Sequence, residues 1–295
     1  QAQAFVSEQI GDEHRVPSPV RSPVSFWAHC TIRRACFWHS SDYGLCFLSV
    51  NVARMSRTSA QKPDTARVRL ILNSDVGESF GLHSFGNDLQ LMDVIDVANV
   101  ACGFHAGDPD VMSATIEAAA ARGIKVGAHP GLPDLVGFGR REMKLTPSEV
   151  ENVILYQVGA LSAFLRTYGM ELNHIKPHGS LYGMLARDAE LMVAAAKVAM
   201  LYGVPFYGLA GTQHETVCRR MGIPFVGELY VDLNYGPQGE LLIQRRPEPT
   251  RPEAAEDRVR RFLSEGTIEA VDGTLLRFEA DSICVHSDAP NSVEV

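Results

Sequence analysis

From Val68 onward, the chain alternates short runs of β-branched and other apolar residues with longer segments of helical periodicity. Seven of the short runs are predicted strands: 68-VRLILNSD, 94-VIDVANVACGFH, 124-IKVGAHP, 173-NHIKPHG, 205-PFYGLAG, 224-PFVGELYVD and 282-SICVHSD. Strands that alternate with helices predict βαβ units and a parallel sheet. Because no evident turn leads back toward a sheet edge, seven such strands favour a β/α barrel, regular or distorted, over an open doubly wound sheet.

Local signals mark where several helices begin and end. Asp108 precedes Pro109 as an N-cap, and Gly123 closes the same segment. The sequence 146-TPSE is a capping box, and the apolar residues after it recur at helical spacing. A third helix is predicted over residues 188–202. These segments fall between the predicted strands, as a parallel sheet requires.

The first 67 residues differ from the rest of the chain. They carry 8 Lys and Arg against 5 Asp and Glu, and they show no sustained periodicity. We predict an unstructured or loosely packed extension over residues 1–67 and a catalytic barrel domain over residues 68–295. Two interpretations of residues 1–54 stay open. The first is a gene-model extension or loose tail. The second is a targeting segment, which is supported only by the arginine content and low acidity of these residues.

Charge narrows the classes of function. The formal net charge of the 295 residues is −8, and residues 68–295 hold 19 basic against 30 acidic residues. Nucleic acids and anionic membranes are both recognised through basic patches, so neither is a predicted partner. Six cysteines without a CxxC pair indicate reduced core thiols, and no apolar run is long enough to span a bilayer. We therefore expect a cytoplasmic enzyme that acts on a small molecule.

Polar side chains stand at the ends of six of the seven predicted strands. In chain order they are Asn73, Asp75 and Glu78; His105; His129; Lys176 and His178; Glu228 and Asp232; and His286 and Asp288. The carboxyl ends of parallel strands build the active site of a β/α barrel. Acids, bases and an anion-holding cation would meet there, which predicts a catalytic site at this end.

Each of these residues also has a structural interpretation. A single histidine at a strand end is more often hydrogen-bonded for structure than catalytic, and Asp75 could be a turn residue before Gly77. Lys176 could extend from a loop to solvent, and Glu228 could pair with a nearby cation. Cys102 and Cys284 are interpreted as core thiols, because neither lies beside an evident base in the sequence. The convergence of the set, rather than any member, carries the catalytic prediction.

A glycine-bearing loop and a metal site are the other candidates. The run 136-VGFGRR places Arg140 and Arg141 beside two glycines, a combination that can clamp a carboxylate or phosphate. No GxxxxGK[ST] motif occurs, so a bound ATP would be held by other means or by another chain. A Zn²⁺ or Mn²⁺ shell is the alternative, and its ligands would be Asp75, His105, His129 and His178. No HxH or i, i+4 pair supports it, so we predict no metal.

Several of these segments together resemble one known family. The segments are 72-LNSDVGESFG, 98-ANVACGFHAGDPDVM, 124-IKVGAHPGLPDLVGFGRR, 155-LYQVGALSAF, 174-HIKPHGSLY, 207-YGLAG and 284-CVHSD. From about Leu70 to Asn291 the chain resembles the LamB/YcsF family, the A component of 5-oxoprolinase. The resemblance implies a distorted, incomplete β/α barrel of the glycoside hydrolase/deacetylase type. The family normally continues into a last helix beyond the position of Val295, so we expect that helix to be missing here.

The resemblance also implies an activity and partners. The reaction is the opening of 5-oxo-L-proline to L-glutamate with hydrolysis of ATP, a co-substrate that partner subunits could bind. The implied partners are the B and C components of 5-oxoprolinase. Two departures from the family pattern stand out: Leu233 replaces a usual arginine in 228-ELYVDLNY, and Ser287 replaces a usual glycine. Two alternatives remain, a metal-dependent deacetylase-like or carbohydrate-active barrel enzyme and a non-catalytic scaffold subunit.

Roles for the site residues complete the prediction. The predicted catalytic residues are Asp75, His105, His129, Lys176 and His178. The predicted substrate- or phosphate-binding residues are Asn73, Glu78, Arg140, Arg141, Glu228, His286 and Asp288. We expect the five catalytic residues to line one pocket at one end of the barrel, with Arg140 or Arg141 near its rim.

Overall fold

A computed structural model describes residues 69–244, 248–277 and 279–295 of the chain. The predicted N-terminal extension, residues 1–67, lies outside the described residues. Among the described residues, no helix combines the length and the apolar character needed to cross a membrane.

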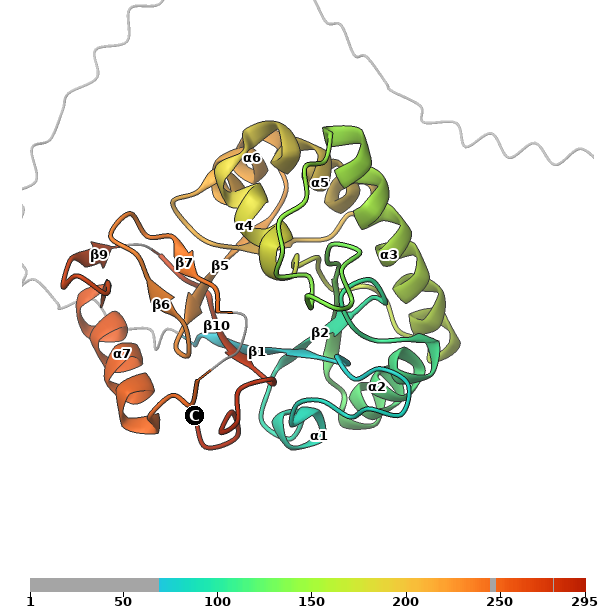
Figure 1. The fold of residues 1–295 in the computed structure, drawn as a ribbon, viewed down its shortest axis with the longest axis horizontal. Helices are drawn as coiled ribbons and strands as arrows, with labels where there is room; N and C mark the ends of the chain where they lie inside the picture. The colour runs from blue at the N-terminus through green and yellow to red at the C-terminus, as the bar shows by residue number, and fades with distance from the viewer. Residues whose placement is uncertain (1–68, 245–247, 278) are drawn as a thin grey trace, which may run out of the picture. The chain divides into compact units, whose positions relative to one another are not determined.

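The centre of the fold is a parallel sheet of six strands in the order β3-β2-β1-β10-β5-β4 (Figure 1). The strands are β1 (Ile71–Val76), β2 (Val97–Ala101), β3 (Lys125–His129), β4 (Phe206–Gly208), β5 (Phe225–Tyr230) and β10 (Ser282–His286). Ile175 forms parallel bridges to Ala128 of β3 and to Phe206 of β4, so one residue joins the two outer strands of the sheet. The seven predicted strand segments therefore form a distorted barrel, as expected from the sequence.

Helices cover the outside of this sheet. They are α1 (Asp88–Leu91), α2 (Pro109–Arg122), α3 (Pro147–Thr167), α4 (Gly179–Arg187), α5 (Ala189–Tyr202), α6 (Gln213–Met221) and α7 (Pro252–Glu265). Helices α2, α3, α5 and α6 follow one another around the sheet, each in contact with the next (Figure 1). The predicted caps of α2 and α3 are present: the Asp108 side chain accepts two backbone N–H bonds, and Thr146 and Glu149 form a reciprocal capping box.

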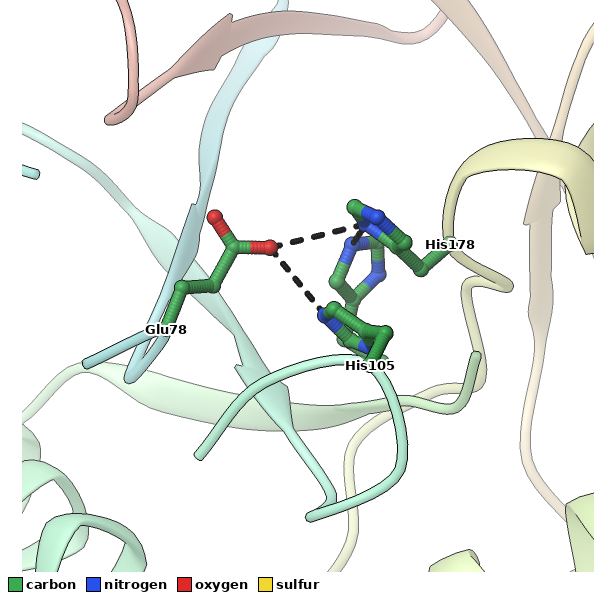
Figure 2. Close-up of side chains that lie close together, drawn as sticks. Glu78, His105 and His178 are labelled. Carbon is green, nitrogen blue, oxygen red and sulfur yellow. Dashed lines mark hydrogen bonds and ion pairs between the residues drawn. The ribbon is translucent and has the colours of Figure 1, made fainter. Parts of the chain in front are cut away.

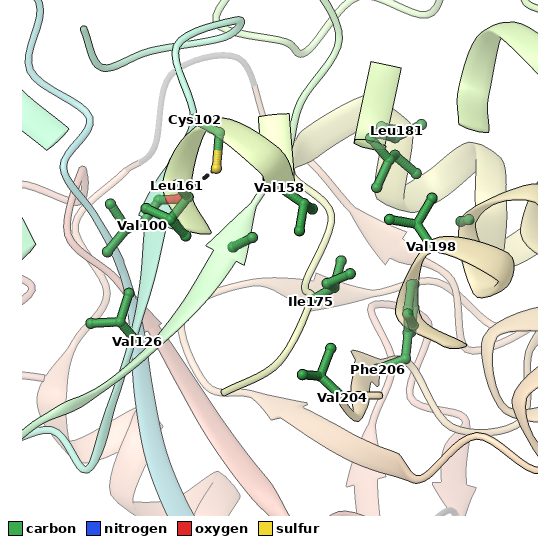
Figure 3. Packing of buried hydrophobic residues seen from close by; sticks show 14 of the residues in the cluster. Val100, Cys102, Val126, Val158, Leu161, Ile175, Leu181, Val198, Val204 and Phe206 are labelled. Carbon is green, nitrogen blue, oxygen red and sulfur yellow. Dashed lines mark hydrogen bonds between the residues drawn. The ribbon is translucent and has the colours of Figure 1, made fainter. Parts of the chain in front are cut away.

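The larger hydrophobic core lies between the sheet and helices α3 and α5 (Figure 3). Val158 and Leu161 of α3 pack over the strands β2 and β3, which contribute Val100 and Val126. All four side chains are fully buried. Burial of each such side chain stabilises the fold by about 1.5–3 kcal/mol, so this side of the barrel is a rigid support for the strand ends.

Short hairpins and α7 cover the β5 and β10 side instead of a further βα repeat. The hairpin strands are β6 (Asn234–Tyr235), β7 (Leu241–Leu242), β8 (Thr267–Glu269) and β9 (Leu275–Arg277). The hydroxyl oxygen of Tyr235 accepts the backbone N–H of Tyr230 at 2.8 Å, which ties the first hairpin to β5. The sequence pattern did not predict these four short strands, because two or three residues are too few to show alternation.

Candidate active site

The carboxyl ends of the strands bring the predicted residues together. Asp75 on β1 is in register with Asn99 on β2 and His286 on β10. His129 ends β3, and Lys176 directly follows the bridging residue Ile175. Because side chains alternate along a strand, these five polar residues point toward the barrel interior while their neighbours pack under the helices.

One group of buried side chains surrounds the Lys176 ammonium, and we call it the lysine cluster. Its members are Asn73, Asp75, Asn99, Lys176, Glu228 and Cys284. The Lys176 Nζ lies 2.9 Å from Asp75 Oδ1, 3.1 Å from Glu228 Oε1, 2.9 Å from Cys284 Sγ and 3.3 Å from Asn73 Oδ1. Cys284 is a buried free thiol, as predicted, but the premise that no ionisable group lies beside it is wrong, because Lys176 does. Non-adjacent strands bring Cys284 to the lysine, and the sequence does not show that contact.

A second group lies beside it, and we call it the histidine cluster. Its members are Glu78, His105, His129 and His178. Glu78 Oε1 lies 3.2 Å from His105 Nε2 and 3.5 Å from His178 Nδ1, as Figure 2 shows. His129 Nε2 lies 2.9 Å from His178 Nδ1, and the rings of His105 and His178 stack with centroids 3.7 Å apart. His129 Nε2 also lies 3.2 Å from Asp75 Oδ2, which links the two clusters.

Backbone carbonyls fix the orientation of two of these histidines. His129 Nδ1 lies 2.7 Å from the carbonyl oxygen of Lys176, and His178 Nε2 lies 2.8 Å from the carbonyl oxygen of Phe138. Carbonyl oxygens can only accept, so both of these ring nitrogens carry a proton and donate it. In the neutral rings, His129 Nε2 and His178 Nδ1 are therefore the nitrogens that bear lone pairs.

The loop after β3 explains the glycines of the VGFGRR run. Phe138 has a positive φ of 55°, which turns its carbonyl group toward His178. A Cβ atom on Gly139 would lie 2.7 Å from the Cβ of His105 and 3.0 Å from Cδ2 of His178. The chain thus needs a glycine at residue 139 so that its backbone can approach the two stacked rings.

Two further ion pairs border the site. His286 Nδ1 lies 3.0 Å from Asp232 Oδ2, and an Arg140 guanidinium nitrogen lies 2.7 Å from Asp288 Oδ2. Arg141 instead pairs with Asp134, and its side chain is half exposed. Of the two predicted rim arginines, the structure brings Arg140 to the site.

The electrostatics of the two clusters differ. Burial opposes ionisation of Asp75, but its contacts with His129 and Lys176 hold its pKa well below the usual value. Burial would also lower the pKa of Lys176, yet the neighbouring Asp75 raises it well above the ordinary value. Asp75 and Lys176 are therefore both charged at neutral pH.

The histidine cluster shows the opposite tendency. Burial, together with the carboxylates of Asp288 and Asp75, raises the pKa of Glu78 well above its usual value. Burial and the neighbouring histidines lower the pKa values of His105 and His178 well below the ordinary value. Without a further partner, His105 and His178 therefore favour the neutral ring, and Glu78 favours the protonated carboxyl group.

A cavity of about 630 Å³, including its open mouth, lies at this end of the barrel. The predicted residues that line it are Asp75, His129, Arg140, Lys176, His178, His286 and Asp288. Four other predicted residues do not line the cavity but lie behind the residues that do: Asn73, Glu78, His105 and Glu228. His105 stacks on His178, and Glu228 contacts Lys176.

Sequence reasoning missed Asn99 and His174, which lie inside the barrel. Asn99 Nδ2 donates to Asp75 Oδ1 at 2.8 Å, and Asn99 Oδ1 lies 2.6 Å from His174 Nε2. Burial lowers the pKa of His174 to about 3, so this ring is neutral and donates to Asn99. A signal was present, since His174 is two residues before Lys176 and therefore faces the same side of the strand.

Comparisons with known proteins show what the chain and its fold are similar to. A model of the LamB/YcsF family matches residues 70–295. The lactam utilization protein lamB of Emericella nidulans is 46% identical over 234 residues, which are 77% of this chain and 91% of that protein. The A subunit of 5-oxoprolinase from Heliobacterium modesticaldum is 44% identical over 232 residues, again 77% of this chain and 91% of that protein. The crystal structure of the lactam utilization protein from Thermus thermophilus matches with a TM-score of 0.70 and 43% identity. The match covers 77% of this chain and 92% of that one.

Proposed function

The chain belongs to the LamB/YcsF family, and from this premise we propose that it is the 5-oxoprolinase component that opens the lactam ring of 5-oxoproline to glutamate. One observation carries the proposal. Asp75 is a buried carboxylate that lies between Lys176 and His129, and it borders the cavity at this end of the barrel. Such a carboxylate is ionised and can accept a proton from a water molecule bound in this cavity.

The chemistry requires an activated substrate. An unstrained five-membered lactam is a poor electrophile, and phosphorylation of its carbonyl oxygen at the expense of ATP makes the ring carbon open to attack by water. The water oxygen then bonds to this carbon, and Asp75 takes the proton. The ring C–N bond breaks, and the leaving nitrogen takes the proton that Asp75 accepted from the water. Breaking this bond leaves an acyl phosphate, and a second water molecule hydrolyses it to the glutamate carboxylate and free phosphate.

The lysine cluster supports this role of Asp75. The Lys176 ammonium keeps the carboxylate ionised, while Asn99 donates to the same oxygen, Oδ1. The other oxygen, Oδ2, is directed toward His129 and His286. Lys176 is therefore a positioning residue for Asp75, and Arg140 on the cavity wall is the better candidate to contact an anionic substrate group.

ATP is assigned to the partner components rather than to this chain. The sequence has no P-loop, and the cavity is bordered by the carboxylates of Asp75, Asp232 and Asp288, which disfavour a bare triphosphate. We propose that the B and C components of 5-oxoprolinase supply the phosphorylated lactam. The protein would act in the cytoplasm, where ATP is available.

The test is reconstitution with the B and C components, with glutamate and ADP measured in parallel. We expect the isolated chain to turn over neither 5-oxoproline nor ATP, and the mixture to release glutamate and ADP in equal amounts. Asp75→Asn should lower glutamate formation by about 10²–10⁴-fold, the usual contribution of a positioned base. ADP formation by the partners should persist.

Asp281→Asn is the matched control. Asp281 is exposed, precedes β10 at the opposite end of the barrel and accepts the backbone N–H of Gly227, which an asparagine oxygen can also accept. The activity of this variant should equal that of the wild type. If Asp75→Asn is as active as Asp281→Asn, the chain is a scaffold for catalysis elsewhere and the proposal fails.

A further inference from the structure

If both rings are neutral, the contact between His129 and His178 cannot be a hydrogen bond, because neither facing nitrogen carries a proton. Each ring donates its one proton to a backbone carbonyl group, of Lys176 and of Phe138 respectively. The two nitrogens that face each other at 2.9 Å, His129 Nε2 and His178 Nδ1, then both bear lone pairs. Two lone pairs at this distance repel unless a proton or a cation lies between or beside them.

Glu78 adds a third electron-pair donor on the same side. Its Oε1 lies 3.5 Å from His178 Nδ1. In a tetrahedral site with bonds of about 2.0–2.1 Å, neighbouring ligand atoms lie about 3.3 Å apart. The ligand atoms of Glu78, His129 and His178, together with that of His105, all lie within 4.8 Å of one another. The spacing of these donors therefore suits a small cation.

Each of the three donors is also held from behind. Carbonyl oxygens orient the two histidines, and His105 Nε2 lies 3.2 Å from the Glu78 oxygen, where it can donate (Figure 2). Metal-binding histidines and carboxylates are oriented in this way by outer hydrogen bonds, which fix the ring tautomer. The strained backbone of Phe138, with a φ of 55°, provides one of these acceptors.

We propose that His129, His178 and Glu78 bind one divalent transition-metal ion of the Zn²⁺ type, and that His105 is a positioning residue for Glu78. Two histidines and one glutamate are a ligand set that leaves a coordination position open for water or substrate. Asp75 Oδ2 lies 3.2 Å from His129 Nε2, one of the three donors. The ion would supply Lewis-acid chemistry next to the carboxylate.

A shared proton is the competing explanation. A proton on His129 Nε2 would satisfy its contact with His178 and could also be donated to Asp75. The shared proton explains only the contact between His129 and His178. A cation also explains why three electron-pair donors converge and why each of them is oriented by an outer hydrogen bond. Metal binding is measured without substrate or partner components. The metal proposal can therefore fail while the proposed function stands, and the proposed function can fail while the metal proposal stands.

The experiment uses the full chain after removal of metal with a chelator. Elemental analysis after incubation with Zn²⁺ and buffer exchange should give one ion per chain. Titration with Co²⁺ should give the intense visible absorption of a tetrahedral or five-coordinate site, and Zn²⁺ should displace it. Glu78→Gln and His178→Gln should each weaken Co²⁺ binding by at least about 100-fold, since each removes a ligand.

Matched controls are Glu117→Gln and His83→Gln, which change the same residue types at exposed positions away from the cluster. They should bind Co²⁺ as the wild type does. Circular dichroism and thermal unfolding check that each variant is folded. If a variant does not fold, the titration of the wild-type protein still decides whether the chain binds a metal ion. Wild-type protein that holds less than about 0.1 ion per chain and gives no Co²⁺ band would establish the shared proton instead. Unchanged binding in both cluster variants would place the ion elsewhere.

Discussion

The lysine cluster and the histidine cluster lie side by side at the same end of the barrel, and both are buried, but their hydrogen bonding differs. In the lysine cluster, one ammonium with three protons faces two carboxylates, an amide oxygen and a thiol. Every proton of Lys176 has an acceptor. In the histidine cluster, the fixed protons point outward to carbonyl groups, and the lone pairs point inward. In the first cluster every lysine proton therefore has an acceptor, whereas in the second the lone pairs of His129 and His178 face each other.

This difference separates two uses of buried polar groups. A complete ion-paired cluster orients its members and holds their charges constant. A cluster with converging lone pairs can bind or transfer something. Asp75 belongs to the first cluster through Oδ1 and contacts the second through Oδ2, so the carboxylate is fixed by one group and acts toward the other.

The largest effect should follow from breaking the lysine cluster. Lys176→Met keeps most of the side-chain volume but leaves Asp75 and Glu228 buried without their cation. Removal of one partner from a buried ion pair costs about 3–5 kcal/mol of unfolding free energy, and glutamate formation should fall with it. Urea unfolding measures the loss of unfolding free energy. Lys197→Met is the control, because Lys197 pairs with Glu151 at the surface and should change stability by less than about 1 kcal/mol. Equal losses would mean that the cluster is not a stabilising unit.

The next effect concerns pH at the border of the lysine cluster. Asp232, against the opposing effect of burial, raises the pKa of His286 to about 9 from its usual 6.5. A raised histidine pKa stabilises the fold fully below about pH 6.5, and this contribution is lost as the pH rises through 9. A shift of this size corresponds to about 3 kcal/mol.

Asp232→Asn should remove most of that contribution. We expect the difference in unfolding free energy between wild type and variant to be largest at about pH 6 and to shrink by about pH 9.5, as followed by urea unfolding at several pH values. Groups that titrate equally in wild type and variant contribute equally to both unfolding free energies, so their contributions cancel when one is subtracted from the other. A difference that does not vary over this range would show that the pair does not hold His286 protonated.

The sequence predicted the barrel because its strands and helices have strong local signals. Six of the seven strand runs form strands of the sheet, and the run from residue 173 contributes the parallel bridges of Ile175. The capping box at Thr146 and the N-cap at Asp108 have their predicted structure. The strand-end rule also brought Asp75, His129, Lys176 and His178 to one cavity. Their catalytic roles stay predictions.

Contacts between strands that are distant along the chain could not be predicted in this way. Cys284 and Lys176 are 108 residues apart, and their contact depends on the register of β10 against β1. The tautomers of His129 and His178 depend on two backbone carbonyls, one of them in a loop with unusual φ. The prediction of no metal relied on the missing HxH motif, but three strand-end loops can bring ligands together without any local motif.

The smallest predicted effect tests how closely the loop after β3 packs against the histidine cluster. Gly139 and Gly103 both have positive φ values, 62° and 95°, so an alanine at either position is strained by about 1–2 kcal/mol. A Cβ at residue 139 would also crowd His105 at 2.7 Å, whereas a Cβ at residue 103 would have no neighbour within 4 Å. Gly139→Ala should therefore lose about 1–3 kcal/mol more unfolding free energy than Gly103→Ala, because a closely packed site must shift to accept the methyl group. Thermal and urea unfolding of the two variants measure this. The same displacement of His105 and His178 should lower glutamate formation in the reconstituted mixture. If the two alanine variants are equally stable, the loop can move away from the rings, and the carbonyl of Phe138 does not hold His178 rigidly.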